Sequence, residues 1–481
     1  MNGFERKKIT KFSPAERKKI RHHIFAAVGV LFILFFLFQA GARVIDGLSG
    51  TKAVRFITSF LGRDLLVDED GHTNILLLGV GGKNHDGGTL TDSIMIGSIN
   101  YDDNQVAMLS IPRDLYIDSS LGAFRVNQLF EEASSRWDEL QGLDFVRETL
   151  QEILDIPLHY VVKVDFRAAE AVVDAVGGID VYVHNTINDP LYPKDGTYEY
   201  EPFYLERGLR HLDGKTALKY ARSRKTSSDF DRSRRQQQVL VALKQKALEK
   251  NILKRASRLK DIYYSLSEHI VTNMSIREML SLGDFAASWD SKNISSATLN
   301  DESLFTGGFL YPPLRSLYGG AYVLVPAGDN FDSVRQFARL ILYGPPHIDD
   351  YPVMIFNGTK TNGYAGRTRL ILNRFGPQIQ RVANGRDNTL IQTSWYAQDQ
   401  ASLRVAKALT DIIPGEVTQE IPPEYEAIFL ETPNAIILEL GSDSEAHISK
   451  LDVFRNIVEL KPTPAPAEDA SATAADETEN T

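Results

Sequence analysis

The stretch Ala217 to Gln238, ALKYARSRKTSSDFDRSRRQQQ, is the most informative part of this sequence. It gathers cationic side chains in a short window, whereas the chain as a whole is acidic, with a formal net charge of -10. The arginines in it are Arg222, Arg224, Arg232, Arg234 and Arg235. A local cationic cluster in an acidic chain indicates a binding site for a compact anion, and the acidic balance argues against a nucleic-acid partner.

The second half of this stretch has the periodicity of one helical face. The residues on that face are Arg232, Arg235, Gln236, Val239, Leu240, Leu243 and Ala247. Because the aliphatic end of the face is typical of burial, we expect its guanidinium and amide end to point into the interior or a cleft. Asp229 or Asp231 is the expected N-cap, and the first turn offers free N–H groups to an anion.

Arg222 and Arg224 are two residues apart, so in an extended segment both side chains point to one side. Together with the arginines at the helix start they predict guanidinium forks around a phosphate group. The alternative is a solvated basic helix start. It fits less well, because Arg232 and Gln236 share the apolar face whereas Arg234 does not.

The N-terminal residues predict a membrane anchor. Residues 1–23 form a basic head, and residues 24–42, IFAAVGVLFILFFLFQAGA, are uncharged and about long enough to cross a bilayer. The basic flank predicts a single-pass protein of the plasma membrane, with the head cytoplasmic and everything after Arg43 outside. A cleaved signal peptide is the alternative, because Ala40-Gly41-Ala42 resembles a cleavage site. Residues 43–70 are expected to form a connector.

Composition and alternating patterns predict two folded units. The 481 residues allow two or three domains, and the absence of cysteine excludes disulfides and thiol nucleophiles. Alternating strand and helix patterns predict a mixed-sheet α/β sandwich over 71–345. Strands are expected at 74–78, 92–99, 106–111, 159–164 and 179–183. Helical segments are expected at 126–153, with breaks, and at 168–176, 251–296 and 331–342.

A smaller α/β domain is expected over 351–442. Its predicted helices are 363–375 and 398–409, and its predicted strands lie near 379 and at 389–396, 427–430 and 435–440. The remainder, 443–481, is acidic and is predicted to be disordered from about residue 461.

Two carboxylates stand at the ends of apolar strands of the larger domain. Asp92 opens one strand, and Arg113-Asp114 follows the Pro112 that ends the next. Carboxylates at a sheet edge suit Mg²⁺, which binds them together with phosphate oxygens, although solvated loop starts have the same composition. The glycine-rich loop at 79–88 lacks the third glycine of a dinucleotide fingerprint and the GK[ST] of a Walker loop, so it is a weak motif.

Six ordered motifs carry a resemblance to the LytR-CpsA-Psr family of cell-envelope proteins. They are NILLLG from Asn74, TDS from Thr91, IPRD from Ile111, VDAVGGID from Val173, LDGKTAL from Leu212, and YARSR from Tyr220 followed by DFDR at Asp229 and RQQ at Arg235. The resemblance spans about residues 74–342. Residues 351–442 are similar to the C-terminal accessory domain of LytR-type proteins.

The resemblance implies a bitopic protein that transfers a glycopolymer from a polyprenyl-pyrophosphate carrier to a cell-wall acceptor glycan, with Mg²⁺ or Mn²⁺. It implies metal or structural roles for Asp92 and Asp114, and a tunnel for the lipid tail. For the reaction itself we expect Asp114, or secondarily Asp92, to help deprotonate the acceptor hydroxyl. The resemblance also implies a pyrophosphate clamp, to which the helical face adds Arg235. The clamp residues are Arg113, Arg222, Arg224, Arg232 and Gln236.

The sequence departs from the family pattern at three places. Leu90 replaces an arginine before the TD motif, Val80-Gly81 replaces an acidic residue after the first strand, and Asp231 replaces a glycine. We hypothesise that Asp86, or secondarily His85, supplies the missing metal or phosphate ligand. The transferase reading has two alternatives: a pyrophosphatase that uses water as the acceptor, and a non-catalytic scaffold that binds the lipid carrier.

Overall fold

The computed structural model describes residues 65–451, except 83–86, 194–198, 224–228, 248–268, 302–307, 329 and scattered positions from 276 to 292. The predicted anchor at 24–42, Arg224, His85, Asp86 and the tail beyond 451 therefore lie outside the described residues. Within the described part, no helix has the length and apolar character needed to cross a bilayer.

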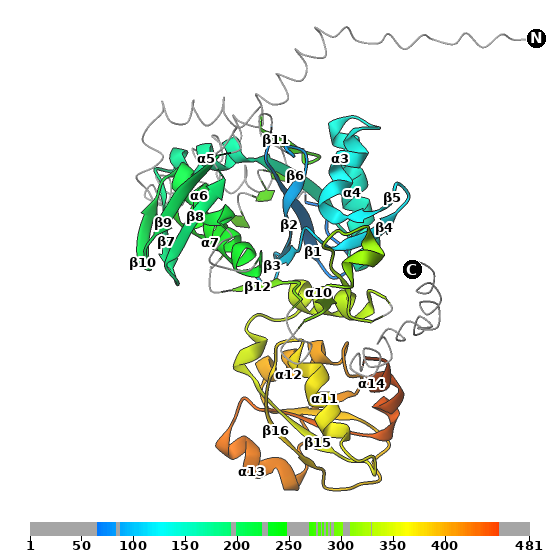
Figure 1. Cartoon of the computed structure of the whole chain (residues 1–481). Helices are drawn as coiled ribbons and strands as arrows, with labels where there is room; N and C mark the ends of the chain where they lie inside the picture. The colour runs from blue at the N-terminus through cyan, green and yellow to red at the C-terminus, as the bar shows by residue number, and fades with distance from the viewer. Residues whose placement is uncertain are drawn as a thin grey trace, which may run out of the picture.

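A mixed six-stranded sheet forms the centre of the larger domain (Figure 1). Its strand order is β11-β6-β1-β2-β3-β12, with parallel pairing for β1 with β6 and for β3 with β12 and antiparallel pairing elsewhere. The predicted mixed sheet is thus confirmed. The strands are β1 (His72–Val80), β2 (Thr91–Asn100), β3 (Gln105–Ile111), β6 (Tyr160–Asp165), β11 (Ile270–Thr272) and β12 (Ile294–Thr298).

Helices cover both faces of this sheet (Figure 1). One face packs on α4 (Glu139–Leu154) and α10 (Asp332–Tyr343), and Leu76, Leu109 and Leu150 are fully buried between them. The flanking elements on that side are β4 (Tyr116–Ser119), β5 (Gly122–Arg125), η1 (Val126–Gln128) and α3 (Leu129–Ser134).

The other side carries a helical layer and two small sheets. Its helices are α5 (Phe166–Ala175), α6 (Gly214–Arg222) and α7 (Asp229–Ala247). The two-stranded sheets pair β7 (Ile179–Val183) with β10 (Gly208–Leu212), and β8 (Ile187–Pro193) with β9 (Tyr200–Leu205). Short elements complete the domain: β13 (Leu310–Tyr311), η3 (Arg315–Tyr318) and β14 (Val325–Pro326).

The smaller domain has a five-stranded sheet in the order β16-β15-β19-β17-β18. Its strands are β15 (Pro352–Asn357), β16 (Gln378–Asn384), β17 (Ser394–Ala397), β18 (Glu416–Thr418) and β19 (Ile436–Leu440). Its helices are η4 (Ile348–Asp350), α11 (Tyr364–Asn373), α12 (Gln400–Leu409), α13 (Pro423–Glu431), η5 (Ser442–Ser444) and α14 (Glu445–Leu451).

Three predicted segments differ from the structure. The strand expected at 427–430 lies inside α13, because Pro423 at the first helical turn starts a helix that a short apolar run does not reveal. The helix expected over 251–296 is wrong where β11 and β12 form, since both are short edge strands. The folded domain continues past 442, where α14 buries Ile448 and Leu451.

Aromatic side chains join the two domains. Phe337 of α10 stacks on Phe309 at 4.4 Å between ring centroids, and Phe375 meets Phe309 edge-on at 5.1 Å. Arg374 lies over the Phe309 ring at 4.6 Å and donates from Nε to the Gly308 carbonyl. Burial lowers the pKa of Arg374 to about 10, because the charged guanidinium loses its hydration there. The domains therefore share a buried contact rather than a flexible link.

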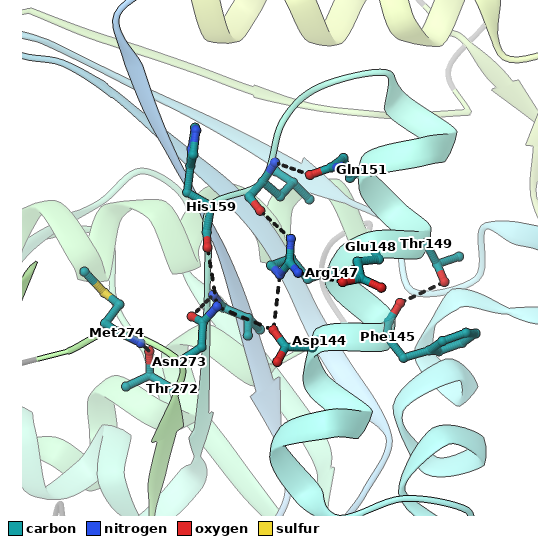
Figure 2. Close-up of polar contacts among 12 residues, drawn as sticks. Asp144, Phe145, Arg147, Glu148, Thr149, Gln151, His159, Thr272, Asn273 and Met274 are labelled. Carbon is teal, nitrogen blue, oxygen red and sulfur yellow. Dashed lines mark hydrogen bonds and ion pairs between the residues drawn. The ribbon is translucent and has the colours of Figure 1, made fainter. Parts of the chain in front are cut away.

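A polar network fastens α4 to the edge of the central sheet (Figure 2). The Asn273 side chain accepts a hydrogen bond from the buried Val161 N–H at 2.9 Å and donates to Asp144 and to the His159 carbonyl. On α4, Arg147 donates to Asp144 and to the Leu158 carbonyl. Asn273 thus replaces a backbone partner where β11 ends.

Replacing Asn273 with alanine tests this network. The change leaves the buried Val161 N–H without its acceptor, so we expect the free energy of unfolding to fall by about 1–3 kcal/mol. Chemical denaturation measures it, with the exposed Asn362→Ala as the matched control. Equal stability of the two variants would show that Asn273 contributes nothing to the sheet edge.

Candidate active site

Strand register brings Asp92 and Arg113 together. The β2–β3 ladder ends at the pair Ile94 and Ile111. The residues two positions beyond each, Asp92 and Arg113, therefore face each other where the two strands end, and this end of the sheet is called the sheet edge below. Arg113 Nη1 lies 2.8 Å from Asp92 Oδ1. The sequence placed both residues at strand ends, and the antiparallel pairing makes them partners.

Asp114 is enclosed between two arginines. It is 5% exposed, with Oδ2 3.5 Å from Arg113 Nε and Oδ1 3.4 Å from Arg125 Nη1. Arg125 ends β5, and sequence reasoning missed it because nothing in the pattern GAFR marks a contact with a residue across a hairpin. Asp114 therefore holds two guanidinium groups at this edge.

The N-terminal part of α7 reaches the same edge. Gln236 Nε2 donates to Ser93 Oγ at 2.7 Å, and Arg232 Nη2 donates to the Asp92 carbonyl at 3.4 Å. Arg232 is only 5% exposed. The prediction that the polar end of this helical face turns inward is confirmed, and it turns toward Asp92.

Arg235 joins α7 to the end of α6. Its guanidinium is buried and donates to the Tyr220 carbonyl at 2.8 Å and to the Ser223 carbonyl. Burial lowers the pKa of Arg235, and its hydrogen bonds satisfy carbonyls at a helix end. These contacts place Arg235 between the end of α6 and the start of α7. The adjacent Arg234 is exposed and pairs with Asp231.

Two local expectations for this stretch are wrong. Arg222 is the last residue of α6 rather than part of an extended segment, and its guanidinium lies 4.0 Å from the Phe166 ring centroid. Neither Asp229 nor Asp231 precedes α7 as its N-cap, because the helix begins at Asp229. In both cases the helix includes residues of the 217–238 stretch that its polar composition had assigned to an extended segment or a cap.

A further carboxylate lies beside the first strand. Asp165 is the register partner of Val80, the position where the sequence lacks the family's acidic residue. Its Oδ1 accepts from the Ala168 N–H at 2.9 Å and its Oδ2 contacts His269 Nδ1 at 2.5 Å. A Cβ at Gly82 would lie 2.9 Å from the Asp165 Cβ, so glycine permits this close approach. Sequence reasoning missed Asp165 because its neighbour is on another strand.

The donor set fits a magnesium ion only in part. Among the described residues, no three His, Asp or Glu side chains gather as a metal cluster. The Asp92 side chain is 32% exposed, whereas Asp114 is enclosed by guanidinium groups. Asp92 is therefore the carboxylate suited to a metal that takes its other ligands from phosphate oxygens and water.

Comparison with known proteins shows the family of this chain. A model of the LytR_cpsA_psr family matches residues 42–333, more than half of the chain. The chain belongs to the LytR-CpsA-Psr family. A second model, described as LytR cell envelope-related transcriptional attenuator, matches residues 350–443 and so confirms the C-terminal domain.

Relatives in this family carry transferase names. The chain is 30% identical over 249 residues to polyisoprenyl-teichoic acid–peptidoglycan teichoic acid transferase TagT of Bacillus subtilis, covering 51% of this chain and 70% of the relative. It is 28% identical over 252 residues to the like-named TagV of that organism, covering 51% of this chain but only 58% of the relative. The solved B. subtilis TagV structure has a TM-score of 0.41 and 27% identity, over 57% of this chain and 98% of that one.

Arg234 and Arg235 allow a paired test of the contact between α6 and α7. Because Arg235 is buried on helix-end carbonyls, Arg235→Ala is expected to lower the free energy of unfolding by about 2–3 kcal/mol. Arg234→Ala removes an exposed charge and is expected to change it by no more than about 0.5 kcal/mol. Denaturant titrations of both variants measure the difference. Similar losses in the two would contradict a special role for Arg235.

Proposed function

We propose that this protein transfers a glycopolymer from a polyprenyl-pyrophosphate carrier to a hydroxyl group of a cell-wall glycan. The observation that carries the proposal is the convergence of Arg113, Arg232 and Gln236 on the sheet edge at Asp92. Clustered guanidinium groups suit a pyrophosphate, because their charge and forked donors match its oxygens. The names of the relatives support the substrate class, and membrane anchoring through residues 24–42 belongs to the same proposal.

In the proposed reaction the acceptor hydroxyl oxygen attacks the phosphorus that bears the sugar. The new P–O bond forms as the bond to the bridging oxygen breaks, and polyprenyl phosphate leaves with the electron pair. Arg113 and Arg232 stabilise the charge that develops on the phosphate oxygens. Arg222, the last residue of α6, lies 4.0 Å from the Phe166 ring centroid and in this proposal also contacts the pyrophosphate. Arg224 and Asp86 remain candidate ligands from the sequence alone.

The two carboxylates take different roles in this proposal. Asp114 positions Arg113 and Arg125, since both of its oxygens contact guanidinium groups. Asp92 is more exposed and, in place of the Asp114 first expected, accepts the hydroxyl proton, or it would hold Mg²⁺ or Mn²⁺. A metal bound there would add positive charge beside the phosphate oxygens.

Product analysis with labelled lipid-linked donor and wall glycan tests the proposal. We expect wild-type protein to move label to the glycan, and Arg113→Ala to lower kcat/KM by about 100-fold or more, because a charge contact to the reacting phosphate is lost. Arg381→Ala, an exposed change in the smaller domain, serves as control. Release of labelled phosphosugar to water alone would identify a pyrophosphatase. Carrier binding without turnover would identify a scaffold.

Asp92 gives a separate test of the metal. If it is a ligand, Asp92→Asn weakens Mg²⁺ or Mn²⁺ affinity in direct titrations, because an amide oxygen carries no charge. If it accepts the proton, metal affinity is unchanged and only turnover falls. Unchanged affinity and turnover would remove Asp92 from the site.

A further inference from the structure

A polar cleft of about 560 Å³ lies between the two domains. Its walls include the ends of β1 to β3 at His72, Asn100 and Gln105, part of α10, and the C-terminal half of α12. Asp92 and Arg113 stand at the opposite ends of these strands. At roughly 3.3 Å per residue, Asn100 lies about 25 Å along β2 from Asp92, so the cleft is separate from the candidate active site.

The first-domain side and floor of the cleft are rigidly held. His72 is buried, with Nδ1 2.9 Å from Ser98 Oγ and Nε2 3.0 Å from the Asn100 amide. Its ring packs on Tyr343 at 4.4 Å between centroids. Gln105 Nε2 donates to the Gly344 carbonyl at 2.7 Å, which fixes the segment that leads to the smaller domain. The cleft is therefore formed before any ligand arrives, as small-ligand sites at domain interfaces usually are.

An ion pair and a hydrogen bond link the two domains at the cleft. Arg339 of α10 lies 3.0 Å from Asp70 Oδ2 and 3.6 Å from Asp411 Oδ2, a residue of the smaller domain. Gln336 also donates to the Asp411 carbonyl at 3.2 Å. Of the three described acidic residues that line the cleft, Asp70 and Asp411 are thus engaged by Arg339, whereas Asp103 is not.

The opposite wall carries two positive side chains that lack a close ion-pair partner in the described part of the chain. Arg404 and Lys407 of α12 are exposed, line the cleft and have no acidic partner within 4 Å among the described residues. They are three positions apart, so they are neighbours on the helix surface and repel each other. Such a pair facing a preformed cavity is stabilised by an anion. Asp103 and Asn293, across the cleft, add acceptors and donors suited to hydroxyl groups.

We propose that this cleft binds an anionic, hydroxyl-rich glycan segment through Arg404 and Lys407. The choice of a glycan rests on the proposed function. The charge and the size of the cleft are observed independently of it. The anion has two possible sources: the phosphate of a polyol-phosphate polymer, or the carboxylate of a muramic acid residue in the wall glycan. A site some 25 Å from the reacting edge, by the strand spacing above, is within reach of a polymer but not of a single sugar.

Calorimetric titration of the full-length protein tests the cleft. The probes are a poly(glycerol phosphate) oligomer, a muramic-acid-containing oligosaccharide, neutral chitotetraose and inorganic phosphate. We expect at least one anionic glycan to bind, and Arg404→Gln with Lys407→Gln to weaken that binding about 10-fold or more, because charge-assisted contacts are lost. The matched control, Lys360→Gln with Arg369→Gln, removes two exposed charges from the same domain outside the cleft and is expected to bind like wild type.

The identity of the probe that binds distinguishes the two sources. Equal binding of chitotetraose, binding of inorganic phosphate alone, or an unchanged affinity in the Arg404 and Lys407 variant would each overturn the proposal. Repeating the titration with Arg113→Ala separates the two sites. Retained glycan binding is expected there, and its loss would place the glycan at the active site and overturn the cleft. Because no turnover is measured, these outcomes do not depend on whether the transferase proposal holds.

Discussion

The arrangement of the candidate site depends on the hydrogen bonds that the Arg235 guanidinium donates to the carbonyls at the end of α6. It ties the carbonyls at the end of α6 to the first turns of α7. Arg222 ends the first of these helices, and Arg232 and Gln236 project from the second. A buried cation that satisfies helix-end carbonyls fixes both helices at once, since leaving those groups unpaired away from water is costly. Arg235 thus has a structural role: it holds the two helices so that Arg232 and Gln236 face the sheet edge.

Bringing several guanidinium groups to one place requires negative charge. Asp92 and Asp114 supply it at the sheet edge, each within 3.5 Å of Arg113. This explains why carboxylates occur in a site proposed for an anion: they keep the arginines in place until phosphate oxygens replace part of their contacts. Asp92 makes the shorter contact with Arg113, at 2.8 Å, and is the more exposed of the two, so it is the carboxylate that a ligand can reach. Asp114 lies 3.5 Å from Arg113 and is enclosed between Arg113 and Arg125.

Sequence patterns predicted the central strands, the inward face of α7 and the family, because each depends on residues close together in the chain. They did not predict Arg125 or Asp165, whose partners lie across a hairpin and on a parallel strand. They also misplaced the strand at 427–430, since a short apolar run has no period long enough to separate helix from strand. The separate role of Arg235 was hidden for a different reason. Arg232 and Arg235 lie on the same face of α7, and the sequence does not show that the end of α6 lies beside Arg235 alone.

The contact between the domains brings α12 of the smaller domain to one wall of the cleft. Phe309, Phe337 and Phe375 bury the junction, and Arg339 holds the cleft beside it. A rigid junction matters for a polymer substrate, because two sites on a fixed frame bind one chain with a higher effective concentration than two tethered domains would. The sheet itself is that frame: its strands carry Asp92 at one end and border the cleft at the other. The distance along β2 between Asp92 and Asn100 therefore sets how many glycan units a polymer needs to occupy both sites.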